Sequence, residues 1–591
     1  MYYAGGRYEA YASPVKPIGA KHKQVYLIGS GLAALSGAFF LLRDAQMDGS
    51  QIHILEKNPI PGGACDGYHF DSIGFVMRGE RQMDEHYECL WDLMRSIPSQ
   101  DDPGLSLLDE FYRLNKKDPN YSLCRATEKC GQDAHVDSTF GLSANSLKEL
   151  TRFFLTPDEK LQGKSIQDVL SEETLLSNFW FHYKTVYAFE NWHSALELKR
   201  YLRRFAHQLD GLADMTAFRF TKYNQYEALI LPILQYLEER GVQFEYNVNV
   251  TNVVFDTGMG TKAATRIDLL RDGQEESIDL TEDDLVFISI GGSVENSTIG
   301  SQTETAIFNA ETHEGDGWEL WKRIAEQDPS FGHPEVFCST PEQSNRMSAT
   351  IMTLDRRIVP YIKKICKRDP FSGKTVTGGI VTCRDSGWLL NWSVSRQPQF
   401  RAQDQDKLCI WLYGAYTDKP GNYITKTMRE CTGIEICEEW LYHLGVPIDQ
   451  IEHLAQYSAN TVPVMMPYIT SQMLPRSAGD RPAVVPEGAV NFAFIGQFAE
   501  TPGDAVFTAE YSVRTAMEAV YSLLRVDRAV PEVMGSISGL RTMLGAWLRL
   551  RDGRALREMN LNWFERRLLA RVCKKLKGTE LEKLLEEYKL N

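Results

Sequence analysis

The segment from Val25 to Glu56 constrains the fold more than any other part of this chain of 591 residues. It opens with a short apolar run typical of a buried strand, which leads directly into the glycine turn Gly29-Ser-Gly31-Leu-Ala33. A helical stretch follows, and a second strand-like run ends in the acid Glu56. Strand, glycine turn, helix, strand and acid in this order are the fingerprint of a dinucleotide-binding βαβ unit.

Each position of the fingerprint has a predicted task at a bound dinucleotide. The first glycine makes the tight turn, and the second lets a pyrophosphate approach the backbone. The small alanine lets the helix pack closely on the sheet, and the unpaired N–H groups at the helix N-terminus face the phosphates. The acid accepts hydrogen bonds from a ribose, and a second glycine turn at residues 59–64 suits further approach to the cofactor. From these two turns we predict cofactor contacts at Gly29, Ser30, Gly31, Ala33, Glu56 and Gly63.

A membrane span and a signal peptide are the alternatives for this apolar segment. Residues 25–42 carry no charge and are about long enough to cross a bilayer. The two glycines at the strand-to-helix turn and the Arg43-Asp44 continuation argue against a span. The preceding segment is polar and contains Pro14 and Pro17, which argues against a signal peptide.

The length of the chain predicts several domains, because one core does not serve so many residues. The strands near residues 285 and 491 each end in glycine, so the chain returns to the nucleotide-binding part after an excursion, as in two-domain flavoproteins. We predict an α/β fold in which a Rossmann-like, glutathione-reductase-type FAD-binding domain is interleaved with a substrate domain. The predicted parts are an N-terminal arm (1–22), an FAD-binding domain (23–135, 211–300 and 485–525), a substrate domain (136–210 and 301–484) and C-terminal amphipathic helices (526–591).

The charge and the cysteine content of the chain indicate the redox compartment and the kinds of partner of the protein. The eleven cysteines are scattered without a C-x-x-C pair, which predicts free thiols in a reducing cytosol and no zinc site. The formal net charge is −15, yet residues 541–577 carry eleven Lys or Arg against three acids. Aromatic and leucine residues alternate with these bases, which is typical of a helix in an anionic lipid interface. Docking of this region on its own body or on a second subunit is the alternative, and we expect no nucleic-acid partner.

Long motifs resemble one known family. They are residues 26–33, 78–92, 189–201, 222–226, 466–470 and 494–521. Together they are similar to the bacterial oleate hydratases, once called myosin-cross-reactive antigens, over nearly the whole chain. The resemblance implies FAD-dependent, redox-neutral addition of water to the cis-9 double bond of a free unsaturated fatty acid, giving a 10-hydroxy acid. It also implies a homodimer in the cytosol with peripheral membrane contact.

The resemblance assigns catalytic residues, and one of them departs from the family. Alkene hydration needs a proton donor at one carbon and an oriented, activated water at the other. The family's proton-donating tyrosine matches Tyr201, but its water-activating glutamate is replaced by Gln82. A carboxamide orients water and does not take up its proton at neutral pH. Three accounts remain open: Glu80 acts as the base, the chain is a Glu-to-Gln trapped or impaired form, or it acts on a different unsaturated lipid.

Two further sets of contacts follow from the matching segments. The loop at residues 78–83 and the late strand-glycine-acid-helix unit are the places where such folds brace the flavin. Additional cofactor contacts are therefore predicted at Arg81, Met83, Val250, Gly496, Asp504 and Thr508. The family binds the fatty-acid head group with Thr, Asn and His, and the matching positions here are Ser393, Ser395 and Gln399, beside Arg396. These residues form hydrogen bonds but offer no imidazole, so the preferred head group is expected to differ.

Two rival functions share the flavin fingerprint. A generic FAD oxidoreductase would bleach its flavin with substrate, whereas a hydratase leaves the flavin oxidation state unchanged. A lipid-binding flavoprotein without chemistry is favoured by Gln82 and by the altered head-group segment.

Overall fold

The computed structural model describes residues 8–65, 67–79, 82–133, 138–258, 260–313, 315–534, 539–555, 567, 571 and 580–590. One of its two large sheets is a parallel five-stranded sheet in the order β18-β11-β1-β2-β7. Four of the apolar runs predicted as strands are mostly buried here, as expected for a parallel sheet covered on both faces, whereas the edge strand at residues 243–246 is only partly buried. The strands are β1 (Val25–Ile28), β2 (Ile52–Glu56), β7 (Gln243–Tyr246), β11 (Leu285–Ser289) and β18 (Phe492–Ile495).

Two helices pack together beside this sheet. They are α2 (Leu32–Arg43), which follows the glycine turn, and α16 (Ala509–Leu524), which follows the late glycine unit. A Cβ added at Gly37 of α2 would lie 3.0 Å from Leu27 of β1, so the absence of a side chain permits the close approach. The predicted α/β fold with a Rossmann-like unit is thereby confirmed.

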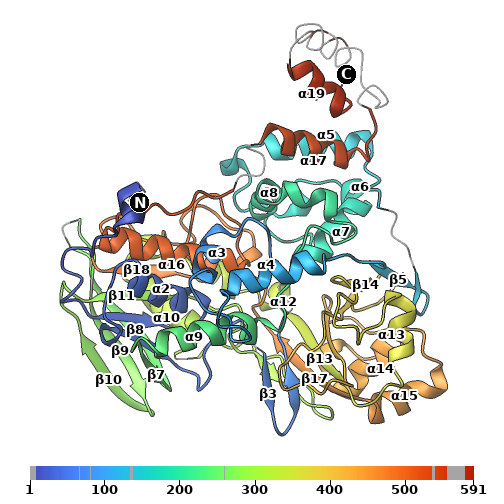
Figure 1. Ribbon diagram of the computed structural model, residues 1–591, viewed down its shortest axis with the longest axis horizontal. Helices are drawn as coiled ribbons and strands as arrows, with labels where there is room; N and C mark the ends of the chain where they lie inside the picture. The colour runs from blue at the N-terminus through green and yellow to red at the C-terminus, as the bar shows by residue number, and fades with distance from the viewer. Residues whose placement is uncertain are drawn as a thin grey trace.

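A small antiparallel sheet and several helices surround the parallel sheet, and the small sheet lies on the left of Figure 1. The sheet has the order β10-β9-β8 and packs through β8 against α10. Its strands are β8 (Val248–Asp256), β9 (Ala263–Arg271) and β10 (Gln274–Asp279). The helices are α1 (Tyr8–Ala12), α3 (Glu88–Met94), α4 (Leu107–Lys117), α9 (Leu231–Glu238), α10 (Gly317–Ala325), α11 (Glu335–Cys338) and α12 (Pro341–Ser344).

The second large sheet has eight strands in the order β12-β17-β13-β16-β15-β14-β5-β6. Its neighbouring strands are antiparallel except for β14 and β5. The strands are β5 (Ala126–Glu128), β6 (Gln132–Asp133), β12 (Thr298–Ile299), β13 (Arg346–Thr353), β14 (Val381–Cys383), β15 (Leu390–Ser393), β16 (Cys409–Gly414) and β17 (Ala459–Met466). A separate apolar core joins it to α13 (Val359–Cys366), α14 (Gly433–His443) and α15 (Ile448–Tyr457). The hairpin β3 (Tyr68–Phe70) and β4 (Gly74–Val76) lies beside β13 and β17.

The helical segment after residue 138 shares the core of the parallel sheet, not the core of the second sheet. It comprises α5 (Ala144–Leu155), α6 (Glu172–Leu175), α7 (Asn178–Tyr187), α8 (Ala195–Arg204) and the 3-10 turn η4 (Ala206–Gly211). Conversely, β5, β6 and β12 come from segments that we assigned to the FAD-binding domain. The predicted boundaries therefore differ from the sheet membership, because strand pairing across more than 250 residues, such as Thr382 with Ala126, leaves no local signal.

The first part of the C-terminal region docks on the body of the same chain. Helix α17 (Leu540–Leu550) packs against η4, and α19 (Glu580–Glu587) lies beyond it, at the top of Figure 1. Asp552 accepts hydrogen bonds from the backbone N–H groups of Phe140 (2.6 Å) and Gly141 (3.0 Å), and Arg554 donates to the Leu142 carbonyl (2.8 Å). Docking is thus seen for residues 539–555, while most of residues 556–579 lie outside the described part.

Among the described helices, none is long and apolar enough to cross a bilayer. Residues 25–42 fall in β1, the glycine turn and α2. Ten cysteines fall in the described part, and all ten are free, as predicted from their scattered positions. Cys573 lies outside it.

Candidate active site

The two glycine turns meet backbone to backbone at the carboxyl end of β1. Gly29 has a φ of +86°, a left-handed conformation that favours glycine. Gly62 donates its N–H to the Ser30 carbonyl (3.0 Å), and a Cβ added at Gly63 would lie 3.0 Å from the Gly31 Cα. The turns predicted to hold a cofactor therefore form one continuous strip of backbone with little side-chain cover.

The N-terminus of α2 opens onto the same strip. Its N-cap residue is Gly31, which offers no side chain to satisfy the first N–H groups of the helix. Glu56 is 6 % exposed and accepts hydrogen bonds from Ser30 (2.8 Å from N, 2.6 Å from Oγ) and from Asn58 (2.8 Å from N and from Nδ2). Glu56 thus fixes the shape of the glycine turn as well as closing β2.

A cleft of about 530 Å³, which we call the glycine cleft, runs along this strip. A large cleft lined by free backbone N–H groups at a helix N-terminus suits a dinucleotide. Two of the predicted contacts, Met83 and Asp504, do not line it, and Arg81 lies outside the described residues. The predicted residues that do line it are Gly29, Ser30, Gly31, Ala33, Glu56, Gly63, Val250, Gly496 and Thr508.

An ion pair that was not predicted from the sequence lies in the wall of the glycine cleft. Lys57 Nζ lies 2.6 Å from a Glu295 carboxylate oxygen and 3.7 Å from Asp316. Burial works against the charge on Lys57, but Glu295 outweighs it and raises the pKa of Lys57. Lys57 directly follows Glu56, the acid of the fingerprint, and this position could have indicated that Lys57 lies at the glycine cleft. Nothing in the sequence near Glu295 indicates that it pairs with Lys57.

A second cavity, of about 160 Å³, surrounds the phenol of Tyr201 and is lined mainly by apolar side chains. Tyr201 extends from α8, is 3 % exposed and donates its hydroxyl hydrogen to the Val506 carbonyl (2.5 Å). The rings of Tyr187 and Phe189 contact it edge to face, at centroid distances of 5.4 and 4.9 Å. Gln82 lines the same cavity, so two predicted catalytic residues come together; Glu80 lies outside the described residues.

This Tyr201 cavity adjoins the glycine cleft. Arg78, Phe507, Thr508 and Ala509 line both. Phe507 has a φ of +65°, which costs free energy for a side chain of this size, and its N–H donates to the Gln497 amide oxygen (2.5 Å). A strained backbone position thus stands at the wall between the two sites.

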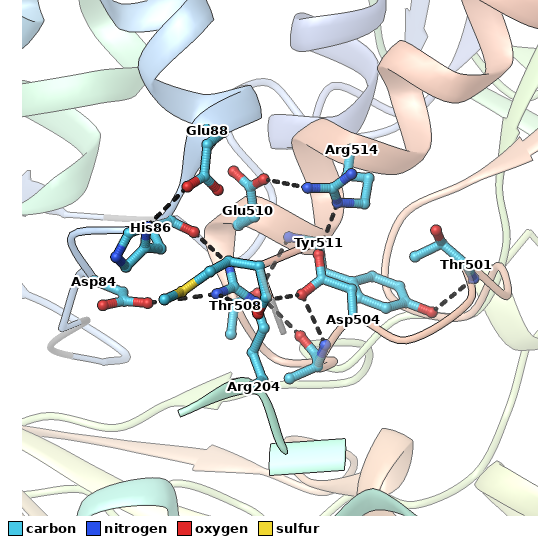
Figure 2. Close-up of polar contacts among 12 residues, drawn as sticks. Asp84, His86, Glu88, Arg204, Thr501, Asp504, Thr508, Glu510, Tyr511 and Arg514 are labelled. Atoms are coloured by element: carbon cyan, nitrogen blue, oxygen red, sulfur yellow. Dashed lines mark hydrogen bonds and ion pairs between the residues drawn. The ribbon is translucent and has the colours of Figure 1, made fainter. Parts of the chain in front are cut away.

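Buried charges hold this wall in place (Figure 2). Arg204, at the end of α8, places its Nε 3.1 Å from one oxygen of Asp504, and Arg514 of α16 places its Nε 2.9 Å from the other. The side chains of these three residues are at most 2 % exposed. Asp504, which we predicted to contact the cofactor, is bound by these two arginines. It ties the loop that carries Val506 to the helix that carries Tyr201.

The residues predicted to bind the head group lie away from the Tyr201 cavity lining. Ser393 is buried at the end of β15, and Ser395 and Gln399 line a separate cavity of about 20 Å³ beside Gln225. Arg396 Nε lies 2.7 Å from Asp118, so its charge is paired.

The profile of the MCRA family matches residues 22–521. The chain is 46 % identical over 594 residues to an oleate hydratase of Streptococcus pyogenes serotype M49, covering 100 % of both sequences. It is 27 % identical over 528 residues to a linoleate hydratase of Lactiplantibacillus plantarum, covering 84 % of this chain and 92 % of that one. Among solved structures, a CLA-producing fatty acid isomerase from P. acnes aligns at 12 % identity with a TM-score of 0.45, over 85 % of this chain and 98 % of that one.

Proposed function

The chain belongs to the MCRA family, and from this membership we propose that it is a hydratase that adds water to a double bond of an unsaturated fatty acid. The finer proposal is that oleate is hydrated at its cis-9 bond to a 10-hydroxy acid. The observation that carries it is the convergence of Tyr201 and Gln82 in one apolar cavity beside the glycine cleft.

The proposed reaction is a balanced addition of water. The Tyr201 hydroxyl transfers its proton to one alkene carbon, and a water oxygen bonds to the other carbon. That water loses a proton to Glu80, and exchange of protons with solvent restores both the Glu80 carboxylate and the phenol. The product therefore gains one water, and no electrons are exchanged. Because the hydroxyl donates to the Val506 carbonyl without substrate, that carbonyl holds the phenol at a fixed place until the alkene is present.

Water activation is divided between two residues in this proposal. The Gln82 amide oxygen accepts a hydrogen bond and orients the water, and Glu80 takes up the proton. Comparing Glu80→Gln and Gln82→Glu for turnover of oleate tests this division. Full activity in the Glu80→Gln variant would remove Glu80 from the proposal. A large gain in the Gln82→Glu variant would instead identify the natural chain as an impaired form.

The glycine cleft fits FAD, which is the cofactor in this proposal. The cleft volume, the uncapped N-terminus of α2 and the bare glycine backbone suit a pyrophosphate and its two nucleoside parts. Bound there, FAD would supply a rigid polar wall beside the Tyr201 cavity, with no net electron transfer. The nine cofactor residues that line the cleft are the proposed contacts, together with Arg81. Met83 and Asp504 are proposed to act through the loops that they hold.

Ser393, Ser395 and Gln399 are proposed to hydrogen-bond the polar head group of the substrate. Their hydroxyl and amide groups donate hydrogen bonds to a carboxylate, hydroxyl or ester oxygen. Arg396 does not add a free charge, because Asp118 pairs with it.

We also propose that the basic residues of 557–577 contact an anionic lipid surface. The described side chains of Arg567 and Arg571 are exposed, whereas Arg549, Arg551 and Arg554 donate to backbone carbonyl groups of the chain itself. Replacing Arg566, Arg567, Arg571, Lys574 and Lys575 by glutamine should therefore weaken binding to phosphatidylglycerol vesicles without changing the melting temperature. Equal binding by both forms would rule out this role.

A homodimer is proposed through the N-terminal arm. Val15 is 77 % exposed and Ile18 is fully exposed, next to the exposed rings of Tyr8 and Tyr11. A second copy of the chain is the proposed cover for these apolar groups. Light scattering of an Ile18→Lys variant should show a shift toward the monomer, and an unchanged mass would refute the arm as the interface.

The experiment that tests the proposed function is incubation of the flavin-loaded protein with oleate in heavy-oxygen water, followed by mass spectrometry and an absorbance spectrum. A hydratase incorporates one heavy oxygen per product and leaves the flavin spectrum unchanged. Bleaching of the flavin by oleate would indicate an oxidoreductase. Unchanged oleate would indicate a lipid-binding protein.

A further inference from the structure

One peptide group in the wall between the two sites has a hydrogen-bond partner on each side. The carbonyl of the Val506–Phe507 peptide accepts the hydroxyl hydrogen of Tyr201 (2.5 Å), and its N–H donates to the side-chain oxygen of Gln497 (2.5 Å). Tyr201 lines the apolar cavity, whereas Gln497 lines the glycine cleft. The orientation of this single peptide is therefore coupled to both sites.

The Gln497 side chain is held with its oxygen toward the peptide. Its Nε2 donates to the Thr508 carbonyl (3.0 Å) and to the Ser512 hydroxyl (2.8 Å). A reversed amide would place Oε1 against the Thr508 carbonyl, and two acceptors without a hydrogen between them repel each other. Gln497 therefore selects the peptide orientation in which the N–H points away from Tyr201.

The selected orientation is strained. Phe507 has a φ of +65°, in a region that bulky side chains rarely adopt. A flip of the preceding peptide changes this angle by about 180°, to about −115°, which lies in the allowed β region. The residues on both sides have their own anchors: Asp504 is bound by two arginines, and Thr508 accepts from the Tyr511 N–H as the N-cap of α16 (3.1 Å). A flip of this one peptide thus relieves the strain while the anchors stay in place.

Proton transfer from Tyr201 reverses what its oxygen needs. In the proposed reaction the O–H bond breaks, the alkene π electrons form a C–H bond, and the phenol oxygen keeps the O–H electron pair as a phenolate. That oxygen would then face the Val506 carbonyl oxygen, acceptor against acceptor, at a position where Tyr201 is 3 % exposed. A buried charge without a donor is costly, and a donor placed where charge develops lowers the barrier. After the flip, the Phe507 N–H points to the phenol oxygen.

We propose that the Phe507 N–H donates a hydrogen bond to the Tyr201 phenolate during alkene protonation, and that the Val506–Phe507 peptide flips to place it there. Gln497 holds the resting orientation, in which the phenol keeps its proton. The inference rests on the proposed function for the role of Tyr201. The N–H keeps its own hydrogen throughout, so the atoms and electrons of the hydration are unchanged.

The first test removes the N–H alone. Phenyllactic acid in place of Phe507 replaces the N–H by an ester oxygen and keeps the ring. In the flavin-loaded full chain, kcat for oleate should fall about 10²- to 10³-fold, as for loss of one donor to a developing oxyanion, with little change in KM. The same ester at Phe371, whose N–H donates to Asp369 in an exposed turn (3.3 Å), is the matched control and should leave kcat unchanged.

Gln497→Met separates a catalytic role of the N–H from a structural one. The variant removes the resting partner of the N–H, with a side chain of similar shape, and leaves the N–H itself. At saturating flavin, kcat should equal or exceed that of the natural chain, because the flip becomes easier. A loss as large as that caused by the ester would mean that the N–H only holds the loop, and would overturn the proposal. Full activity of the ester at residue 507 would overturn it as well.

Fluorine NMR of the full chain with 3-fluorotyrosine at position 201 detects the flip without turnover. In the flavin-loaded, substrate-free protein, the resonance should move in Gln497→Met, because residue 201 then faces an N–H instead of a carbonyl. It should not move in Ser512→Ala, since the Thr508 carbonyl still orients the Gln497 amide. An unmoved resonance in Gln497→Met would contradict the flip. The expected movement in a chain that does not hydrate oleate would refute the proposed function alone.

Discussion

The glycine cleft and the Tyr201 cavity share four lining residues but are built in different ways. The cleft is built around the glycine-containing turns that follow β1, β2, β11 and β18. The cavity is mainly side chains, from α7, α8, β13, β16, β17 and the loop before α16. A backbone cradle needs glycine at defined positions, whereas a side-chain cavity needs only that distant segments converge. The two sites should therefore respond differently to substitution.

Tyr201→Phe should separate the sites most clearly. Loss of the proton donor should lower kcat for oleate hydration by about 10²- to 10⁴-fold, the range for a general acid. Flavin binding should stay unchanged, because Tyr201 does not line the glycine cleft. Tyr187→Phe removes the hydroxyl of a neighbouring ring in the same cavity and should retain most of the activity. An equal loss in both variants would mean that cavity packing, not proton donation, had been disrupted.

Asp504→Asn should damage both sites together. The change leaves Arg204 and Arg514 buried without their shared carboxylate, which typically costs about 3–5 kcal/mol. A drop in melting temperature should accompany losses of flavin binding and hydration. Asp268→Asn in the exposed pair with Arg266 is the control and should shift stability by less than about 1 kcal/mol. Loss of only one function would show that Asp504 does not connect the sites.

Acid should act through the helix that carries Tyr201. Burial disfavours the charge on Glu197, but Arg481, Arg476 and Arg200 outweigh it and lower the pKa of Glu197 to about 2. Glu197 therefore stabilises the fold above its unfolded pKa of about 4.3, and this contribution is lost as the pH falls toward 2. The contribution is on the order of 3 kcal/mol.

Melting curves between pH 7 and pH 3 check the role of Glu197. Glu197→Gln should melt at a lower temperature at pH 7 and should lose less stability on acidification than the natural chain. If acidification lowered the melting temperature of both forms by the same amount, the lowered pKa of Glu197 would not be the cause of the acid sensitivity.

Gly31→Ala should affect the glycine cleft alone. Gly31 has a φ of −68°, which any residue adopts, and the added Cβ would meet only the Gly63 Cα, at 4.0 Å. The fold should be unchanged, while the Cβ crowds the bound pyrophosphate and weakens flavin binding by about 10- to 100-fold. Gly104→Ala, at an exposed loop, should bind flavin normally. Normal flavin affinity in Gly31→Ala would remove this turn from the cofactor site.

The sequence predicted the glycine cleft better than the cavity for a physical reason. Gly29, Gly31 and Glu56 work through local backbone geometry, which a short motif records, and the parallel sheet around them is confirmed. The meeting of Tyr201 with Gln82 was predicted only through the family resemblance. Asp504 has the expected position in the loop, but the orientation of its side chain is set by the ion pairs with Arg204 and Arg514, which are distant in sequence or on another element.

The most direct test of the central claim is a crystal structure of the flavin-loaded chain with bound oleate in the Tyr201→Phe variant. The account predicts that the double bond lies in contact with the ring edge at residue 201, within about 4.5 Å, with Gln82 on the other side. An acyl chain that passes outside this cavity, or a double bond far from residue 201, would contradict it.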